Sequence, residues 1–189
     1  MTDPPPVDPG PLSGWRRTET TAETVLDLGP VSVTTATAVY EDPDLRERVR
    51  EATGVDRTWR FFFATRVDVP GSSDSAALRR LVTDRATAGF VDRLRERGFE
   101  DVDEAGRRRL RVGEREARAV RYDAVCRVEG FVVAVEGWIA VRPGEGGFVL
   151  AGGAYPRAVR SEPADAGLAT LVDPGAFRED LFELIRATG

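Results

Sequence analysis

The chain contains no histidine, lysine, asparagine or glutamine, so each of its 27 basic residues is arginine. Without histidine and lysine it has no Ser-His-Asp or Cys-His couple, no Schiff-base lysine, no imidazole metal ligand and no phosphate-loop lysine. Its one cysteine, Cys126, excludes an intramolecular disulfide and a multi-cysteine zinc site. Acid–base or nucleophilic chemistry is therefore left to carboxylates, hydroxyls, three tyrosines and one thiol.

The charge balance is mildly acidic, with 32 acidic residues against 27 arginines and a net charge of −5. Nucleic-acid binders usually carry a basic excess, so we expect no nucleic-acid partner. An acidic chain rich in Ala, Val and Gly but free of lysine resembles the proteins of halophilic archaea, whose acidic surfaces stay hydrated in concentrated salt. A GC-rich bacterial genome would favour a similar composition.

No targeting or membrane signal is visible. Residues 1–11 have neither a basic nor an apolar region of the kind found in secretory signals. No apolar run approaches the roughly 20 residues that span a bilayer. We therefore predict a cytoplasmic protein with no membrane insertion. No cofactor is predicted either, because the glycine pairs of the chain are followed by neither a lysine nor a helix start.

The length fits one domain with a short tail. Five of the 12 prolines fall within residues 1–11, so this segment cannot pair into a sheet or wind a helix. We predict a disordered proline-rich tail over residues 1–13 and a single α+β domain over residues 14–189.

Hydrophobic periodicity and turn residues predict the elements of this domain. Helices are expected from Asp42-Pro43 to Gly54, from Asp74 or a neighbouring serine to Gly98, and after Asp173-Pro174. The expected strands are residues 15–27, 31–40, 58–69, 107–112, 117–129, 131–142 and 147–155.

Two of these elements predict how the layers pack. The longest helix carries one apolar stripe, formed by Leu78, Leu81, Val82, Ala86, Phe90 and Leu94. The strand over residues 131–141 is apolar on both faces apart from Glu136, which is typical of a central strand covered on both sides. We therefore predict an antiparallel sheet of about six to seven strands with helices packed on its faces.

The second half of the chain runs from Gly113-Glu114-Arg115-Glu116-Ala117-Arg118 to Tyr122, then from Gly130-Phe131-Val132-Val133 to Tyr155 and a closing helix. This pattern resembles the Mog1/PsbP-like α/β/α sandwich, and as an order of elements it extends over residues 15–189. The resemblance implies binding more than catalysis, because that fold includes adaptors of small GTPases and extrinsic photosystem subunits. None of their functional residues can be matched to this sequence.

The candidate site lies on one predicted hairpin. If Glu129-Gly130 is a two-residue turn, Glu136 stands opposite Asp123 and Trp138 stands opposite Arg121, all on one face. The following hairpin is expected to bring Gly152 near Trp138 and Ala154 near Glu136.

This cluster has two interpretations. Facing carboxylates repel, so one of them could hold a raised pKa and carry a proton, while Arg121 binds an anion beside the wall of Trp138. Alternatively, Arg121 and Arg127 neutralise Asp123 and Glu136 in a structural network, and Trp138 covers Gly152.

We expect a non-enzymatic binding or adaptor module that uses one face of its sheet to bind a protein or a small ligand. The alternative is a small carboxylate-dependent hydrolase or isomerase that uses Glu136 and Asp123. A third hypothesis, an anion-binding strand over residues 107–111, is weaker because acidic residues flank this arginine cluster. Cys126 and Phe62 are expected in the core.

Overall fold

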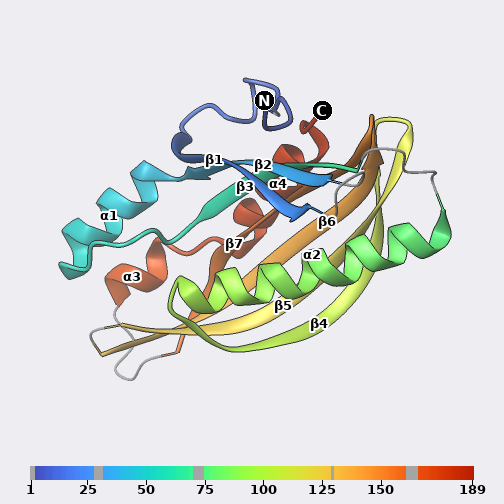
Figure 1. Ribbon diagram of the computed structural model, residues 1–189. Helices are drawn as coiled ribbons and strands as arrows, with labels where there is room; N and C mark the ends of the chain where they lie inside the picture. The colour runs from blue at the N-terminus through green and yellow to red at the C-terminus, as the bar shows by residue number, and fades with distance from the viewer. Residues whose placement is uncertain (1–2, 28–31, 70–74, 129, 161–165) are drawn as a thin grey trace.

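The computed structural model describes residues 3–27, 32–69, 75–128, 130–160 and 166–189. Within them, seven antiparallel strands form one sheet in the order β1-β2-β3-β7-β6-β5-β4 (Figure 1). This confirms the predicted α+β class and its antiparallel sheet. The strands are β1 (Arg16–Asp27), β2 (Ser32–Glu41), β3 (Phe61–Asp68), β4 (Phe99–Val112), β5 (Arg115–Val128), β6 (Phe131–Gly144) and β7 (Gly147–Val159).

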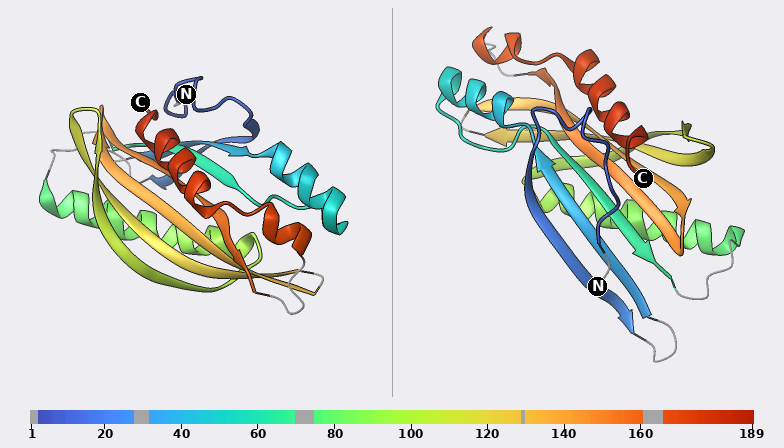
Figure 2. Two further views of the ribbon diagram at one scale, coloured as in Figure 1. Left: turned by 180° about the vertical axis from the view of Figure 1, so that it is seen from behind. Right: turned by 90° about the horizontal axis from the view of Figure 1, so that it is seen from above.

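Helices lie on both faces of the sheet. Helix α2 (Ala76–Glu96) runs along one face, and α4 (Pro174–Arg186) lies on the opposite face over β7 (Figures 1 and 2). Helices α1 (Pro43–Thr53) and α3 (Ala166–Thr170) lie together at one end of the sheet. The short α3 was not predicted, because five residues give too little periodicity to read.

Local capping fixes the helix ends where the sequence places them. The side chain of Asp42 accepts a hydrogen bond from the Leu45 amide at 2.9 Å, and Asp173 accepts one from the Ala176 amide at 3.1 Å. Gly54 follows α1 with a φ of 78°, a left-handed conformation that costs glycine little. Ser75 is the N-cap of α2.

Strand β4 begins well before the predicted start at residue 107. Its first half is acidic and lacks alternation, and it pairs with β5 through irregular registers between Glu100 and Asp103 and between Glu104 and Gly106. A β-bulge breaks the two-residue period, so alternation in the sequence cannot reveal such a strand. The backbone of this half of β4 is nevertheless paired with β5.

The predicted pairing of β5 with β6 is confirmed: Asp123 stands opposite Glu136 and Arg121 opposite Trp138. The predicted pairing of β6 with β7 is wrong by one residue, because Gly144 pairs with Gly147 around a Glu145-Gly146 turn. A one-residue slip moves every side chain to the other face. Trp138 therefore lies opposite Gly153 rather than Gly152, and Glu136 opposite Tyr155 rather than Ala154.

Helix α2 packs on the sheet through its C-terminal half. Phe90 and Leu94 are buried, and the Phe90 ring lies 5.7 Å from those of both Phe63 and Tyr122. The predicted stripe continues toward the N-terminus of the helix but is not buried there, and Leu81 is 55% exposed. The backbone of α2 lies closest to β4 and β6.

The first described residues lie against the last ones. Val7 and Thr188 form an isolated β-bridge, Asp8 donates its amide to the Ala187 carbonyl at 3.0 Å, and Gly189 donates to the Pro6 carbonyl at 2.7 Å. Figure 1 shows the two ends side by side. The described part of residues 1–13 therefore differs from the predicted disordered tail, because residues between the prolines retain amides that can pair with the C-terminal residues.

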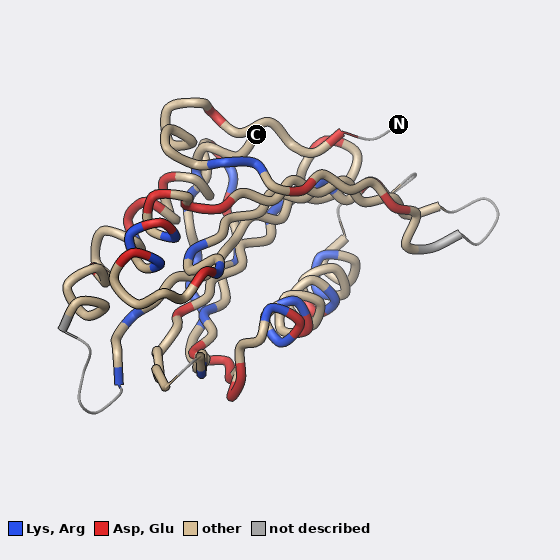
Figure 3. Tube along the Cα trace, turned by 90° about the vertical axis from the view of Figure 1, so that its left-hand side faces the viewer, with Lys and Arg blue, Asp and Glu red and all other residues tan. Residues whose placement is uncertain are grey.

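Among the described residues, none of the helices combines the length and the apolar character needed to cross a membrane. Basic and acidic positions are interspersed along α1 and α2 rather than gathered on one side (Figure 3). Such mixed patterning is typical of solvated helix surfaces.

Candidate functional site

The four predicted site residues share the face of the sheet that α4 covers. Glu136 and Trp138 are buried in the centre, whereas Arg121 and Asp123 on β5 are about one-third exposed. The structure thus brings the four together on one face but divides them into a sealed pair and a more open pair.

Glu136 is completely buried and fully hydrogen-bonded. Arg178 on α4 grips its carboxylate with two bonds of 3.0 Å, from Nε to Oε1 and from Nη2 to Oε2. The Trp138 indole donates to Oε1 at 2.8 Å, and the Tyr155 hydroxyl donates to the same oxygen. A buried carboxylate with this many charge-assisted donors is a structural anchor between α4 and the sheet.

The pKa of Glu136 follows from this environment. Burial on its own would raise that pKa, but hydrogen bonds from Arg178, Tyr155 and Trp138 outweigh burial and hold it below its ordinary value of 4.5. Burial together with the neighbouring carboxylate raises the pKa of the Tyr155 hydroxyl. The expected raised pKa of a repelling carboxylate pair is therefore not found at Glu136, because Arg178 rather than Asp123 dominates its surroundings.

Asp123 and Arg121 are only loosely engaged. The Asp123 carboxylate lies 3.9 Å from Arg121 Nε and 3.7 Å from an Arg157 nitrogen, outside hydrogen-bonding distance of both. Arg121 Nε and Asp123 Oδ1 are buried and have no hydrogen-bond partner in the described structure. Arg127 does not neutralise Glu136, since it pairs with Glu100 and Asp101.

Two partners of Glu136 were missed by the sequence interpretation. Tyr155 was missed because of the slip in the β6–β7 register. Arg178 could have been noticed, because it lies three, four and seven residues before Leu181, Phe182 and Ile185, all buried. An arginine on the buried stripe of a helix signals a buried acid to pair with.

The opposite face of the sheet also carries a hollow. A groove of about 690 Å³ runs between α2 and strands β1–β3. Its floor includes Val33, Val67 and Leu150, and its helical wall includes Leu78 and Val82. The remaining lining residues are Glu23, Val25, Thr35, Thr37, Phe63, Thr65, Val69, Leu81, Arg85, Ala86, Gly89, Phe90, Arg93 and Ile139.

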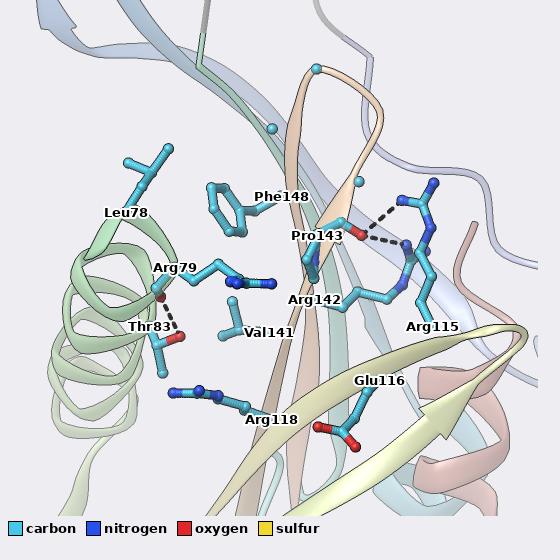
Figure 4. Close-up of a pocket in the computed structure, with 13 residues that line it drawn as sticks. Leu78, Arg79, Thr83, Arg115, Glu116, Arg118, Val141, Arg142, Pro143 and Phe148 are labelled. Carbon is cyan, nitrogen blue, oxygen red and sulfur yellow. Dashed lines mark hydrogen bonds between the residues drawn. The ribbon is translucent and has the colours of Figure 1, made fainter. Parts of the chain in front are cut away.

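A second hollow of about 600 Å³ adjoins this groove at Leu78, which lines both. Figure 4 shows Arg79 from α2 and Arg118 from β5 extending into the space between helix and sheet, beside Val141 and Phe148. On the far side of this hollow, Arg115 and Arg142 both donate to the Pro143 carbonyl. We call this hollow the arginine cleft.

Cys126 is buried, as predicted, and burial raises the pKa of its thiol. Arg57 Nη1 lies 2.8 Å from its sulfur. Within the described part of the chain, no group of three or more Asp, Glu or Cys side chains is arranged to hold a metal ion.

A family model described as a domain of unknown function, DUF6517, matches residues 4–189. The chain belongs to this family. No curated protein and no solved structure matches the chain. The function of this DUF6517 domain must therefore be argued from its own geometry.

Proposed function

We propose that this DUF6517 domain is a binding module for a small amphipathic anion, with an apolar body in the α2 groove and an acidic group in the arginine cleft. The observation that carries the proposal is the half-packed α2. Its N-terminal half presents Leu78, Val82 and Ala86 to a groove rather than to a closed core.

The size and lining of the groove support a small ligand over a protein partner. Ligand pockets are concave, mostly apolar and about 300–1,000 Å³ in volume, whereas protein interfaces are broader. The volume of about 690 Å³ falls within that range. The hydroxyls of Thr37 and Thr65 bond to each other at 2.9 Å on the floor, so they are satisfied without a ligand.

Charge argues for an acidic group on the ligand. Arg79 and Arg118 come from different elements and extend into one cleft (Figure 4). Arg118 makes no ion pair within the described structure, and Glu116, the acidic residue of the cleft, lies 3.6 Å from Arg109 Nε. Arg85 and Arg93 line the apolar groove, where Glu23 is the acidic residue. A carboxylate would bind between guanidinium groups of this kind through charge-assisted hydrogen bonds.

The enzyme alternative is less well supported. A hydrolase or isomerase using Glu136 and Asp123 needs a carboxylate that is open to substrate and able to exchange a proton near neutral pH. Glu136 is instead sealed, bonded to Arg178 and shifted toward the ionised form. The resemblance to the Mog1/PsbP-like sandwich remains a prediction, and its implied binding role agrees with the module proposed here.

Displacement of a fluorescent amphipathic anion, anilinonaphthalene sulfonate, by dodecanoate tests the proposal. Ala86→Trp fills the groove and should weaken dodecanoate binding at least about tenfold. Ala88→Trp makes the same change on the exposed side of α2 and should leave binding unchanged. Equal effects of the two substitutions, or no binding of dodecanoate to the wild type, would overturn the proposal.

The acidic group is tested separately. Arg118→Gln should weaken dodecanoate binding by about tenfold, the loss of one charge-assisted contact, while leaving dodecanol binding intact. Arg48→Gln, which changes an exposed arginine on α1 away from the cleft, is the control. A loss of dodecanol binding in Arg118→Gln would show that the cleft residue acts through the fold rather than through charge.

A further inference from the structure

A third hollow lies on the other face of the sheet, between β4, β5 and α4. It has a volume of about 300 Å³ and is lined by Ala105, Gly106, Arg107, Arg108, Arg121, Trp138 and Arg178. This arginine pocket shares only its sheet with the α2 groove, since α2 and α4 lie on opposite faces (Figure 2). Two of the predicted site residues, Arg121 and Trp138, line it.

Four arginines line the pocket. Three of them, Arg108, Arg121 and Arg178, carry more positive charge than the neighbouring carboxylates, Asp123 and Glu136, balance. Arg108 lies with its guanidinium carbon 5.0 Å from the Trp138 ring and 4.0 Å from the Phe182 ring, and it makes no ion pair among the described residues. Burial, with Arg186 and Arg178 nearby, lowers its pKa. An anion in the pocket would relieve this crowding of like charges.

Arg121 and Arg178 keep hydrogen-bond donors available for a ligand. Arg121 donates Nη2 to the Ala105 carbonyl at 3.3 Å, while its Nε has no hydrogen-bond partner in the described structure. Arg178 uses Nε and Nη2 for Glu136. That bidentate pair fixes the arginine in place, and its Nη1 donates no hydrogen bond to Glu136 or Tyr155.

A glycine creates the space between these side chains. Gly106 stands directly opposite Arg121 in the β4–β5 ladder, so both residues face the same side of the sheet. A Cβ atom added at Gly106 would meet nothing within 4 Å. The position therefore tolerates a side chain sterically, and a larger one would fill the pocket.

The geometry points to a binding site for a phosphate group in the arginine pocket, held by Arg108, Arg121 and Arg178. Guanidinium groups pair with phosphate oxygens through parallel N–H donors. A phosphate group offers three terminal oxygens to donors arriving from three elements, whereas a carboxylate offers two. The Arg108 guanidinium packs against the rings of Trp138 and Phe182, which hold it in place and so reduce the entropy lost on binding.

Calorimetric titration of the full chain with inorganic phosphate, with acetate for comparison, tests this site. Gly106→Val should abolish phosphate binding, and Arg121→Gln should weaken it about tenfold, the loss of one charge-assisted contact. Arg109→Gln is the control, because Arg109 is an exposed arginine on β4, the strand of Gly106 and Arg108, and points to the other face. It should bind phosphate as the wild type does.

Thermal unfolding of each variant establishes that the fold is intact before binding is compared. Arg178 is left unchanged because it anchors Glu136. Absence of phosphate binding by the wild type, equal loss in Arg109→Gln, or wild-type affinity in Gly106→Val would each overturn the site. Dodecanoate binding should persist in Gly106→Val, so failure of this site and failure of the α2 groove are distinguishable.

Discussion

At the scale of single residues, arginine does more here than carry charge. Arg60 is buried, pairs with Asp42 at 2.8 Å and Asp180 at 3.0 Å, and lies over the Phe177 ring at 4.2 Å. Arg97 stacks on Phe61 in the same way, at 4.4 Å. A planar guanidinium can bond at its edge while its face covers a ring, which lysine cannot do.

The Glu136 network gives the sharpest prediction at this scale. Glu136→Gln should lower the free energy of unfolding by about 2–3 kcal/mol, because Arg178 loses its buried charged partner. Asp123→Asn should cost less than about 1 kcal/mol, since its carboxylate is 38% exposed and loosely paired. Urea unfolding measures both. Similar losses in the two variants would contradict the anchoring role of Glu136.

The same network predicts how stability depends on pH. The pKa of Glu136 is lower in the folded chain than its ordinary value of 4.5. Its stabilising effect is therefore complete above the unfolded pKa and is lost as pH falls through the folded one. The difference in unfolding free energy between wild type and Glu136→Gln should hold from about pH 7 to about pH 5 and shrink below about pH 4. Shrinkage already near neutral pH would contradict this.

At the scale of elements, α2 is anchored at one end. Phe90, in its C-terminal half, packs over Gly137 on β6. A Cβ atom at Gly137 would lie 3.3 Å from two ring carbons of Phe90, so the glycine makes room for the ring. Toward its N-terminus, the helix forms the wall of the groove rather than part of the core. The C-terminal half of α2 therefore packs in the core, and its N-terminal half lines the groove.

This division predicts unequal mutational costs along α2. Leu94→Ala should lower the free energy of unfolding by about 2–5 kcal/mol, since Leu94 is fully buried. Leu81→Ala should change it by no more than about 0.5 kcal/mol, because Leu81 is 55% exposed. Guanidinium unfolding compares the two. A large loss in Leu81→Ala would mean that the groove is closed in solution.

The elements that could be predicted are those specified locally. Asp42-Pro43 and Asp173-Pro174 cap their helices through contacts three residues away, and the Gly130 turn sets the β5–β6 register. The Gly144–Gly147 segment offers several turns, so the choice among them depends on packing that the sequence does not display. That single ambiguity concealed Tyr155 as a partner of Glu136.

The open sites were harder to predict than the core. Periodicity shows that Leu78 and Val82 share a stripe, but not that the helix bearing them stands away from β1–β3. Gly106 pairs across a bulged part of β4, where alternation gives no register. Groove and pocket both follow from how elements are placed, which is a property of the tertiary structure.

At the scale of the whole molecule, the paired ends contribute to stability. Removing residues 1–8 deletes the bonds that Pro6 and Asp8 make with Gly189 and Ala187. We expect a loss of about 1–3 kcal/mol, as each hydrogen bond contributes about 0.5–1.5 kcal/mol. Removing residues 1–4 retains those bonds and should cost much less. Scanning calorimetry distinguishes the two truncations, and equal melting temperatures would contradict the pairing.

The order of strands also bears on how the chain folds. Among the strand pairs, β3 with β7 is the one that joins strands distant in sequence, from Phe61 opposite Ala154 to Asp68 opposite Gly147. The other pairs are sequential, so two meanders can form from nearby residues before that seam closes. Closing the long loop between β3 and β7 costs conformational entropy, and this cost is offset only after the β3–β7 contacts have formed. The rate at which this protein folds should therefore be set where β3 meets β7, at Gly153, whose missing side chain leaves room for the Phe61 carbonyl of β3.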